Sequence, residues 1–259
     1  MQALHGIGVL VTRPLPQAIS LCHLLESFGA TAHRLPAIDI IPVAVTPELA
    51  LRLGAIEAFD LIIFTSANAV RFAGALLGPA RDLPLAAIGP ATARALEQAG
   101  HRVTVTPADG FDSERLLQHP KLAQTAGQRI LIVKGIEGRE LLQTELTRRG
   151  ADVQVAAVYR REPSEPNVAE LAALSATVVA DGIQVITATS ADIAAGLLRL
   201  ATPVLRREFD RLHWVVPGAR VAAALRERGV RAPILQADSA EDQDLVAAII
   251  RWRASVSGA

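Results

Sequence analysis

Two stretches with the same polar chemistry occupy equivalent places in the two halves of this chain. Thr65-Ser66 and Thr189-Ser190 each stand between a strand-like run and a helical pattern. A serine hydroxyl can cap a helix, and the free N–H groups of a first helical turn attract anions. Capping alone explains one such junction. Two of them at matching places favour an anion-binding cleft.

A third candidate is the turn that follows the apolar run ending at Val133. Lys134-Gly135 begins this turn and Arg139 closes it, so two cations stand beside exposed backbone amides. The turn is neither a phosphate loop nor a dinucleotide fingerprint, because the Gly-Lys-Ser/Thr and G-x-G-x-x-G spacings are absent. A solvated turn without a ligand is the alternative.

The elements that position these residues repeat along the chain. Strands are predicted at 7–12, 31–35, 60–65, 85–88 and 103–106 with helices between them, including helices over 47–58 and 67–77, and the pattern begins again at Arg129. Landmarks recur in one order at slowly growing offsets, and the pairs are Gly29 with Gly150, Ser66 with Ser190, and Gly89 with Gly218. Such recurrence indicates an internal duplication.

Each copy alternates about five strands with helices, which predicts an α/β fold with two doubly wound, flavodoxin-like parallel sheets. Ligands of such sheets bind at the carboxyl ends of the strands, where helices begin. The residues expected on these two rims are Arg13, Ser66, Gly89, Lys134, Ser190 and Gly218.

The only tyrosine, Tyr159, lies in a short extended segment that Pro163 closes. A similar segment ends at Pro42, and its Ile38 is equivalent to Tyr159. We interpret the two segments as linkers between two similar globular halves. The tyrosine is then expected at a half-buried edge, facing the cleft between the halves.

Composition excludes several functions. The 259 residues carry 26 basic and 26 acidic side chains, so the net charge of zero argues against broad nucleic-acid binding. Six histidines and the single cysteine, Cys22, show no metal-ligand spacing, and we expect no metal site. Neither a signal sequence nor a long apolar run is present, which predicts a cytoplasmic protein without a membrane segment.

The sequence also lacks a Gly-x-Ser-x-Gly nucleophile and a cofactor loop. We therefore expect an enzyme built from this chain to use no cofactor. It would work by positioning its substrate, by hydrogen bonds and by excluding water.

Four motifs, in this order and over nearly the whole chain, resemble the uroporphyrinogen-III synthase family. They are Val11-Thr12-Arg13-Pro14, the stretch 64–70 (Phe-Thr-Ser-Ala-Asn-Ala-Val), the stretch 88–96 (Ile-Gly-Pro-Ala-Thr-Ala-Arg-Ala-Leu), and Val158-Tyr159-Arg160. The chain differs from the family at Lys134, where arginine is more common. Val221 also stands in the second half where the first half has Thr92.

The resemblance implies two α/β domains joined by a two-stranded antiparallel ladder. The implied domain boundaries are 1–37 with 166–259 for the discontinuous domain, 38–46 and 156–165 for the linkers, and 47–155 for the continuous domain. It also implies a cofactor-free, monomeric hydro-lyase of haem biosynthesis. Such an enzyme closes hydroxymethylbilane to uroporphyrinogen III, with loss of water and inversion of ring D.

The same resemblance implies the site. Tyr159 matches the family's tyrosine, which assists departure of the hydroxyl group. The substrate is a linear tetrapyrrole with eight carboxylates, and the residues implied to bind it are Arg13, Thr65, Ser66, Asn68, Gly89, Thr92, Lys134, Gly135, Arg139, Ser190, Gly218 and Arg220.

Two other classes of protein remain as alternatives. One is a two-domain binding module for a small anion, without catalysis, which hydroxymethylbilane turnover would exclude. The other is a nucleotide-using α/β enzyme, which the missing phosphate loops disfavour and which a nucleotide-induced thermal shift would support.

Overall fold

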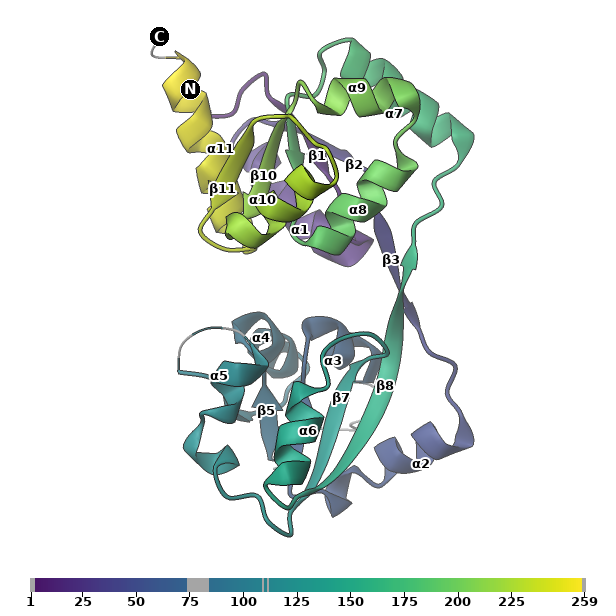
Figure 1. The fold of residues 1–259 in the computed structure, drawn as a ribbon, viewed down its shortest axis with the longest axis vertical. Helices are drawn as coiled ribbons and strands as arrows, with labels where there is room; N and C mark the ends of the chain where they lie inside the picture. Colours follow the sequence, from purple (N-terminus) through teal and green to yellow (C-terminus); the bar gives the residue numbers. More distant parts are fainter. Residues whose placement is uncertain (1–2, 74–83, 109, 111, 258–259) are drawn as a thin grey trace. The chain divides into compact units, whose positions relative to one another are not determined.

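The computed structural model describes residues 3–73, 84–108, 110 and 112–257. The chain divides into two compact units, Met1–Asp39 with Glu162–Ala259, and Ile40–Arg161 (Figure 1). Each unit is built on its own parallel-dominated sheet. The α/β fold with two doubly wound sheets, predicted from the repeat, is confirmed.

The first unit contains a five-stranded sheet in the order β2-β1-β9-β10-β11, and all its pairs are parallel. Its strands are β1 (Gly8–Val11), β2 (Thr31–Arg34), β9 (Val185–Thr187), β10 (His213–Pro217) and β11 (Ile234–Ala237). Numbered along this unit, the order is 2-1-3-4-5, the flavodoxin-like arrangement. The helices are α1 (Leu15–Ser27), α7 (Val168–Val179), α8 (Ala191–Leu200), α9 (Pro203–Phe209), α10 (Gly218–Glu227) and α11 (Asp242–Ser257).

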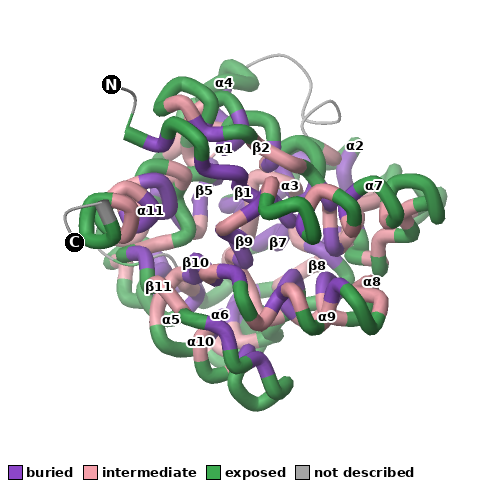
Figure 2. Tube along the Cα trace, turned by 90° about the horizontal axis from the view of Figure 1, so that it is seen from above, coloured by how far each residue is buried: buried purple, intermediate pink, exposed green. Residues whose placement is uncertain are grey.

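Both faces of this sheet are buried, which explains the continuous apolar run of β1. Leu10 packs in a core formed with α7, α8, α9 and α10, whereas Val9 and Val11 pack in a core formed with α1 and α11. Successive side chains of a strand point to opposite faces, so an unbroken apolar strand needs a helix layer on each side. Figure 2 shows the buried residues along β1, β9 and β10 in purple.

The second unit is built on a six-stranded sheet in the order β3-β8-β7-β4-β5-β6. Its strands are β3 (Ile38–Pro42), β4 (Leu61–Phe64), β5 (Leu85–Ala87), β6 (Val103–Val105), β7 (Arg129–Gly135) and β8 (Asp152–Pro163). Its helices are α2 (Pro47–Gly54), α3 (Ala67–Ala73), α4 (Pro90–Gln98), α5 (Ser113–Leu117) and α6 (Leu141–Arg148), with short 3-10 helices at Ile56–Ala58 and Pro120–Leu122.

Local differences from the expected elements are small. The helix predicted over 47–58 is α2 followed by the 3-10 helix, with Ala55 between them. The predicted helix over 67–77 is represented by α3 as far as Ala73, and residues 74–77 lie outside the described residues.

The order β6-β5-β4-β7-β8 matches β11-β10-β9-β1-β2 strand for strand. Each sheet combines strands from both halves of the chain, since β7 and β8 correspond to β1 and β2. The duplication inferred from sequence landmarks is therefore visible in the topology of both sheets.

The second sheet has six strands where five were expected, because β3 adds to its edge beside β8. Val43 N–H donates to the carbonyl of Val158, and Ser164 N–H donates to the carbonyl of Ala37, so the two strands run antiparallel. The segment beginning at Ala156 is also not a separate strand. It continues β8, whose first residues pair in parallel with β7.

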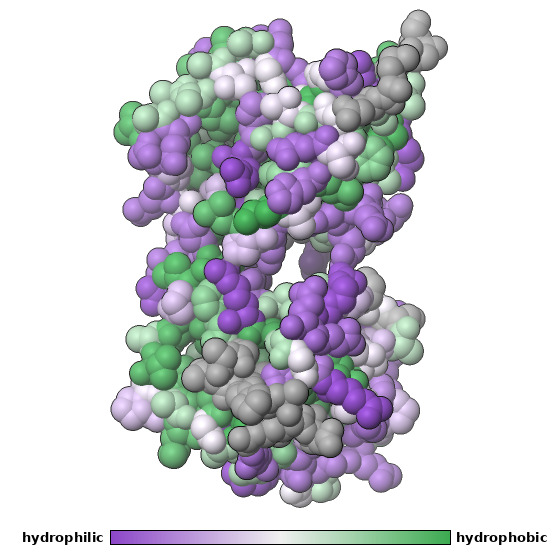
Figure 3. All heavy atoms as spheres, turned by 180° about the vertical axis from the view of Figure 1, so that it is seen from behind, coloured by the Kyte–Doolittle hydropathy of each residue, from purple (hydrophilic) through white to green (hydrophobic). Residues whose placement is uncertain are grey.

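Across the described part of the chain, no helix has both the length and the apolarity needed to cross a membrane. Figure 3 shows hydrophilic and hydrophobic residues interleaved on the face drawn there.

Candidate functional site

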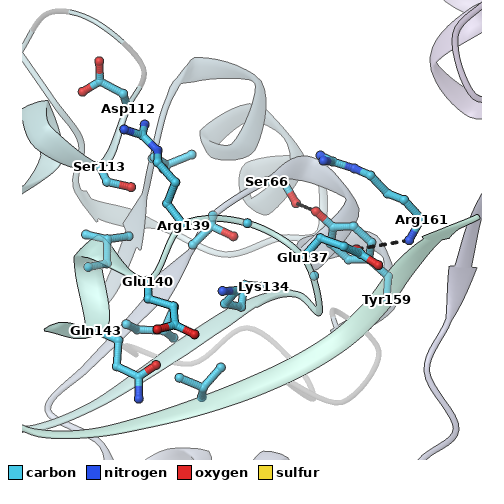
Figure 4. Close-up of a pocket in the computed structure, with 17 residues that line it drawn as sticks. Ser66, Asp112, Ser113, Lys134, Glu137, Arg139, Glu140, Gln143, Tyr159 and Arg161 are labelled. Atoms are coloured by element: carbon cyan, nitrogen blue, oxygen red, sulfur yellow. Dashed lines mark hydrogen bonds between the residues drawn. The ribbon is translucent and has the colours of Figure 1, made fainter. Parts of the chain in front are cut away.

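If β3 is left out and β4 to β8 are numbered 1 to 5 in chain order, the strands of the second sheet read 3-2-1-4-5 from β6 to β8, so the strand order reverses between β4 and β7. The helix after β4 packs on one face of the sheet and the helix after β7 on the other. Such a switch point leaves a crevice at the carboxyl ends of the strands, and ligands bind there. A pocket of about 300 Å³ occupies this place (Figure 4), lined by Thr65 and Ser66 after β4, by Lys134 and Gly135 of β7, and by Tyr159 of β8.

A β-bulge aims Tyr159 at this pocket. Lys134 pairs with Ala157 and Gly135 pairs with Tyr159, so Val158 is an extra residue in β8. Neighbours in a regular strand point to opposite faces. Here Val158 and Tyr159 belong to the same core cluster, beside α3. The extra residue has therefore turned the tyrosine to the side on which Ser66 lies.

Three contacts fix the side chain and backbone of Tyr159. Its hydroxyl oxygen lies 3.0 Å from Oγ of Ser66, and Figure 4 shows the two hydroxyl groups pointing toward each other. Its ring stacks on Phe72, with centroids 6.0 Å apart and planes inclined by 29°. Its carbonyl accepts a hydrogen bond from Ile136 N–H at 2.8 Å. Tyr159 is only 4% exposed, so the expected half-buried edge is wrong. The bulge directs the ring into the core cluster instead.

The two junction hydroxyls after β4 already have partners. Ser66 caps α3 by accepting a hydrogen bond from Ala69 N–H at 3.0 Å, and it also contacts Tyr159. Thr65 Oγ1 donates to the carbonyl of Val133 at 3.4 Å, which joins the ends of β4 and β7. The capping that the sequence allowed is present, and the serine hydroxyl is also part of the pocket.

The charged side chains of the pocket are of both signs. Among the described residues Lys134 has no ion pair, and it is partly buried. Arg139 is paired with Glu114, and its side chain extends away from Tyr159 (Figure 4). The carboxylate of Glu137 accepts a hydrogen bond from Arg161 N–H at 3.2 Å, which fastens the turn after β7 to β8. Lys134 is therefore the pocket cation best placed to meet a new carboxylate.

Three other predicted residues lie at the right ends of strands but do not line the pocket. Gly89 precedes the first residue of α4 with an extended backbone, and Thr92 is buried in the first turn of that helix. Asn68 lies in the first turn of α3 and is partly buried.

The predicted residues of the first unit lie around the corresponding switch point, between β1 and β9. Thr12 joins these strands there, because its hydroxyl donates to the carbonyl of Thr187. Ser190 caps α8 by accepting from Ile193 N–H at 3.2 Å. Gly218 begins α10 with a positive φ of 76°, and Arg220 is exposed in its first turn.

Arg13 is engaged within the first unit. It is 7% exposed, and its guanidinium donates to the carboxylate of Asp242 and to the carbonyl of Ala240. Ser20 also donates to Asp242, at 2.6 Å. These bonds join the end of β1 to the start of α11, so the side chain has a structural partner that the motif alone did not show.

No group of three or more His, Cys, Asp or Glu side chains that could hold a metal ion occurs in the described part of the chain. The sequence did not indicate that Asp112, Glu140 and Gln143 would line the pocket with Tyr159. Their positions in the sequence could have indicated this, because one follows β6 and the other two lie at the start of α6, and both places are at the carboxyl end of the same sheet.

Comparison with known proteins adds independent information. The family model described as "Uroporphyrinogen-III synthase HemD" matches residues 20–247. The chain is similar to the uroporphyrinogen-III synthases of Salmonella typhimurium and Escherichia coli, each 35% identical over 94% of this chain and 100% of the relative.

Two solved structures share the fold. A mutant uroporphyrinogen III synthase from the bacterium Thermus thermophilus matches with a TM-score of 0.59 and 23% identity, over 98% of this chain and 100% of that chain. A uroporphyrinogen-III synthetase from Helicobacter pylori matches with a TM-score of 0.58 and 18% identity, over 95% of this chain and 99% of that chain.

Proposed function

The chain belongs to the uroporphyrinogen-III synthase family, and from this premise we propose that the pocket beside Tyr159 is where its reaction takes place. That reaction, in tetrapyrrole biosynthesis, is a cyclising loss of water. Hydroxymethylbilane closes to uroporphyrinogen III with ring D inverted. The observation that carries the proposal is the contact between Tyr159 and Ser66 at the switch point of the second unit.

The chemistry required of the pocket is modest. The hydroxyl takes up a proton as its bond to the terminal methylene carbon breaks, so it leaves as water, and the electron pair of the pyrrole stabilises the cation that remains. A carbon of ring D then forms the new bond to this cation and that ring releases a proton, so only water is lost overall. A phenol such as Tyr159 assists by donating a hydrogen bond to the departing oxygen at neutral pH. The burial of its ring limits access of water to the cation. Enclosure and hydrogen bonding are sufficient, and no strong base is needed.

We further propose how the substrate's carboxylates are held. Lys134 offers an ammonium group without an ion pair among the described residues, and the turn after β7, which lines the pocket, offers the backbone amides of Gly138 and Arg139. Further contacts are proposed at the same carboxyl end of the sheet, toward α3 and α4, from Thr65, Asn68, Gly89 and Thr92. In the first unit, Ser190, Gly218 and Arg220 are the proposed contacts, while Arg13 supports the rim through its ion pair with Asp242.

The proposal is tested by supplying porphobilinogen and hydroxymethylbilane synthase to the purified protein. The two uroporphyrinogen isomers are then separated by chromatography. Isomer III should predominate, while a control without the protein should yield the uninverted isomer I, because the linear tetrapyrrole closes spontaneously. Isomer I alone, formed at the control rate, would exclude the activity and favour the anion-binding alternative.

A cytoplasmic monomer is the proposed state of the protein. Large apolar side chains that are more than a third exposed are scattered over several elements of both units, and include Leu51, Ile136 and Val168. A patch that could bury a second subunit would gather such side chains in one place. Light scattering should therefore give a mass near 27.4 kDa, and a mass twice as large would exclude the monomer.

A further inference from the structure

We propose that Ser66 and Gly135 are positioning residues, which hold the phenol of Tyr159 so that its proton points into the pocket. The inference rests on the proposed function, because it assigns how Tyr159 is prepared to donate that proton. The two residues act from different elements. Ser66 follows β4 and meets the hydroxyl, whereas Gly135 ends β7 and lies against the ring.

The direction of the hydrogen bond between Ser66 and Tyr159 decides which way the phenol proton points, and our proposal assigns the donor role to Ser66. A serine hydroxyl has one proton and two lone pairs. One lone pair accepts from Ala69 N–H at 3.0 Å, and the phenol oxygen lies 3.0 Å away as the second partner. If Ser66 donates its proton to Tyr159, the phenol keeps its own proton for the pocket. In the opposite arrangement the phenol proton is spent on Ser66 and cannot assist a leaving group.

Gly135 makes room for the ring. A Cβ added at this position would lie 2.7 Å from both Cε2 and Cζ of Tyr159 and 3.1 Å from its hydroxyl oxygen. Carbon atoms do not approach so closely, so any side chain here must displace the phenol. The ring cannot move freely, because Phe72 stacks on it and the strand pairing of β7 and β8 fixes its backbone. The displacement would therefore fall on the hydroxyl and its bond to Ser66.

The variant Ser66→Gly separates this role from helix capping, because glycine is nearly as good a cap as serine. We expect kcat to fall about tenfold or more with KM within about twofold, since the lost interaction acts on the transition state. Ser66→Thr restores a hydroxyl and should recover most of the rate. Thr46→Ala removes a comparable cap from α2, where Thr46 accepts from Leu49 N–H, and should leave the rate unchanged.

Gly135→Ala should lower kcat in the same way, and its matched control is Gly54→Ala, because a Cβ at Gly54 would meet nothing within 4 Å. Both positioning variants should lose most of their effect when Tyr159 is already phenylalanine. A raised kcat in Ser66→Gly would overturn the proposal by showing that the phenol donates to Ser66. An unchanged kcat would overturn it by showing that Ser66 does not orient the phenol. The proposal would also be overturned if Ser66→Gly and Gly135→Ala lowered kcat as much in the Tyr159→Phe protein as in the wild type.

A second readout does not depend on turnover. Tyr159 is the only tyrosine, so protein labelled with 13C at tyrosine Cζ gives one resonance in the NMR spectrum. That resonance should shift in Ser66→Gly and in Gly135→Ala, and it should stay in place in Thr46→Ala and Gly54→Ala. If the wild type proved inactive while these shifts appeared, the proposed function would fail and the positioning would stand. If the wild type were active but the resonance shifted in neither variant, the positioning proposal alone would fail and the proposed function would stand.

Discussion

Oγ of Ser66 lies 3.0 Å from the hydroxyl oxygen of Tyr159, and this contact joins the two halves of the duplicated chain. The serine follows a strand of the first half, whereas the tyrosine lies in a strand of the second. The corresponding residues of the first unit are Ser190, which caps α8, and Ile38, which packs against an apolar core cluster. The pair of hydroxyl groups therefore exists in one unit only, and the duplicated halves have diverged in chemistry while keeping their topology.

Lys134 is predicted to bind substrate without taking part in the chemical step. Lys134→Met removes the charge and keeps much of the length, so KM should rise about tenfold while kcat changes little. Lys134→Arg retains the charge and should stay near the wild-type KM. Initial rates over a range of hydroxymethylbilane concentrations measure both parameters. A fall in kcat alone would show that the lysine acts on the transition state instead.

Two helical glycines should respond in opposite directions to alanine. A Cβ at Gly196 in α8 would lie 2.6 Å from the carbonyl oxygen of Ala37, whereas Gly54 at the end of α2 has nothing within 4 Å. Gly196→Ala should lower the free energy of unfolding by about 1–3 kcal/mol through overpacking. Gly54→Ala should raise it by about 0.4–1 kcal/mol through the unfolded state. Urea unfolding measures both, and a stabilised Gly196→Ala protein would contradict the packing described for α8.

The partly buried ion pair between Arg13 and Asp242 should matter for the stability of the first unit. Asp242→Ala leaves the guanidinium of Arg13 without its carboxylate in a site that is 7% exposed. We expect the free energy of unfolding to fall by about 3 kcal/mol, as for other broken buried pairs. Glu208→Ala leaves unpaired only the guanidinium of Arg211, whose side chain is 77% exposed, and should cost less than about 1 kcal/mol. Equal losses of unfolding free energy in the two variants would show that the burial of Arg13 does not increase the contribution of its ion pair to stability.

His213 should make the protein less stable in acid. Burial lowers the pKa of this imidazole below its usual 6.5, and its ring contacts Trp252 with centroids 4.5 Å apart. The unfolded chain therefore takes up a proton at higher pH than the folded protein. It follows that the free energy of unfolding falls as the pH drops through about 6.5 and down to the folded pKa.

The measurement compares wild type with His213→Gln by urea unfolding at several pH values. At pH 8 the histidine is neutral in both states, so that value serves as the reference for each protein. The variant should lose less stability than the wild type between pH 8 and pH 5. Parallel curves for the two proteins would exclude the histidine as a cause.

Much of the fold could be predicted because its signals are local. The apolar run of β1 requires two helix layers, and Gly29 and Gly150 end their helices with positive φ values of 89° and 86°. Because these signals recur along the chain, the duplication and both doubly wound sheets could be predicted before any coordinates. The antiparallel pairing of the two linker segments, which the family resemblance implied, is present as β3 beside β8. That this pair continues the second sheet could not be predicted, since proline-bounded linkers give no sign of which sheet they will join.

The site was less predictable, because its decisive contacts are not local. Alternation along β8 gives no reason to expect Val158 and Tyr159 on the same face, and the bulge that achieves this depends on the register with β7. The partner of Arg13 lies near the other end of the chain, at Asp242. Sequence spacing predicted which residues follow strands, whereas the pairing of those residues depended on the folded structure.

The central claim is that the phenol of Tyr159 assists departure of the substrate's hydroxyl. The most direct test measures kcat for hydroxymethylbilane closure by Tyr159→Phe, with isomers I and III resolved and the melting temperature recorded. The variant removes one hydroxyl and keeps the ring that stacks on Phe72, so the melting temperature should change little. We predict that kcat falls by roughly ten- to a thousandfold without reaching zero, because enclosure and the rim amides remain. Wild-type kcat in a folded Tyr159→Phe protein would contradict the claim and leave the tyrosine a packing role only.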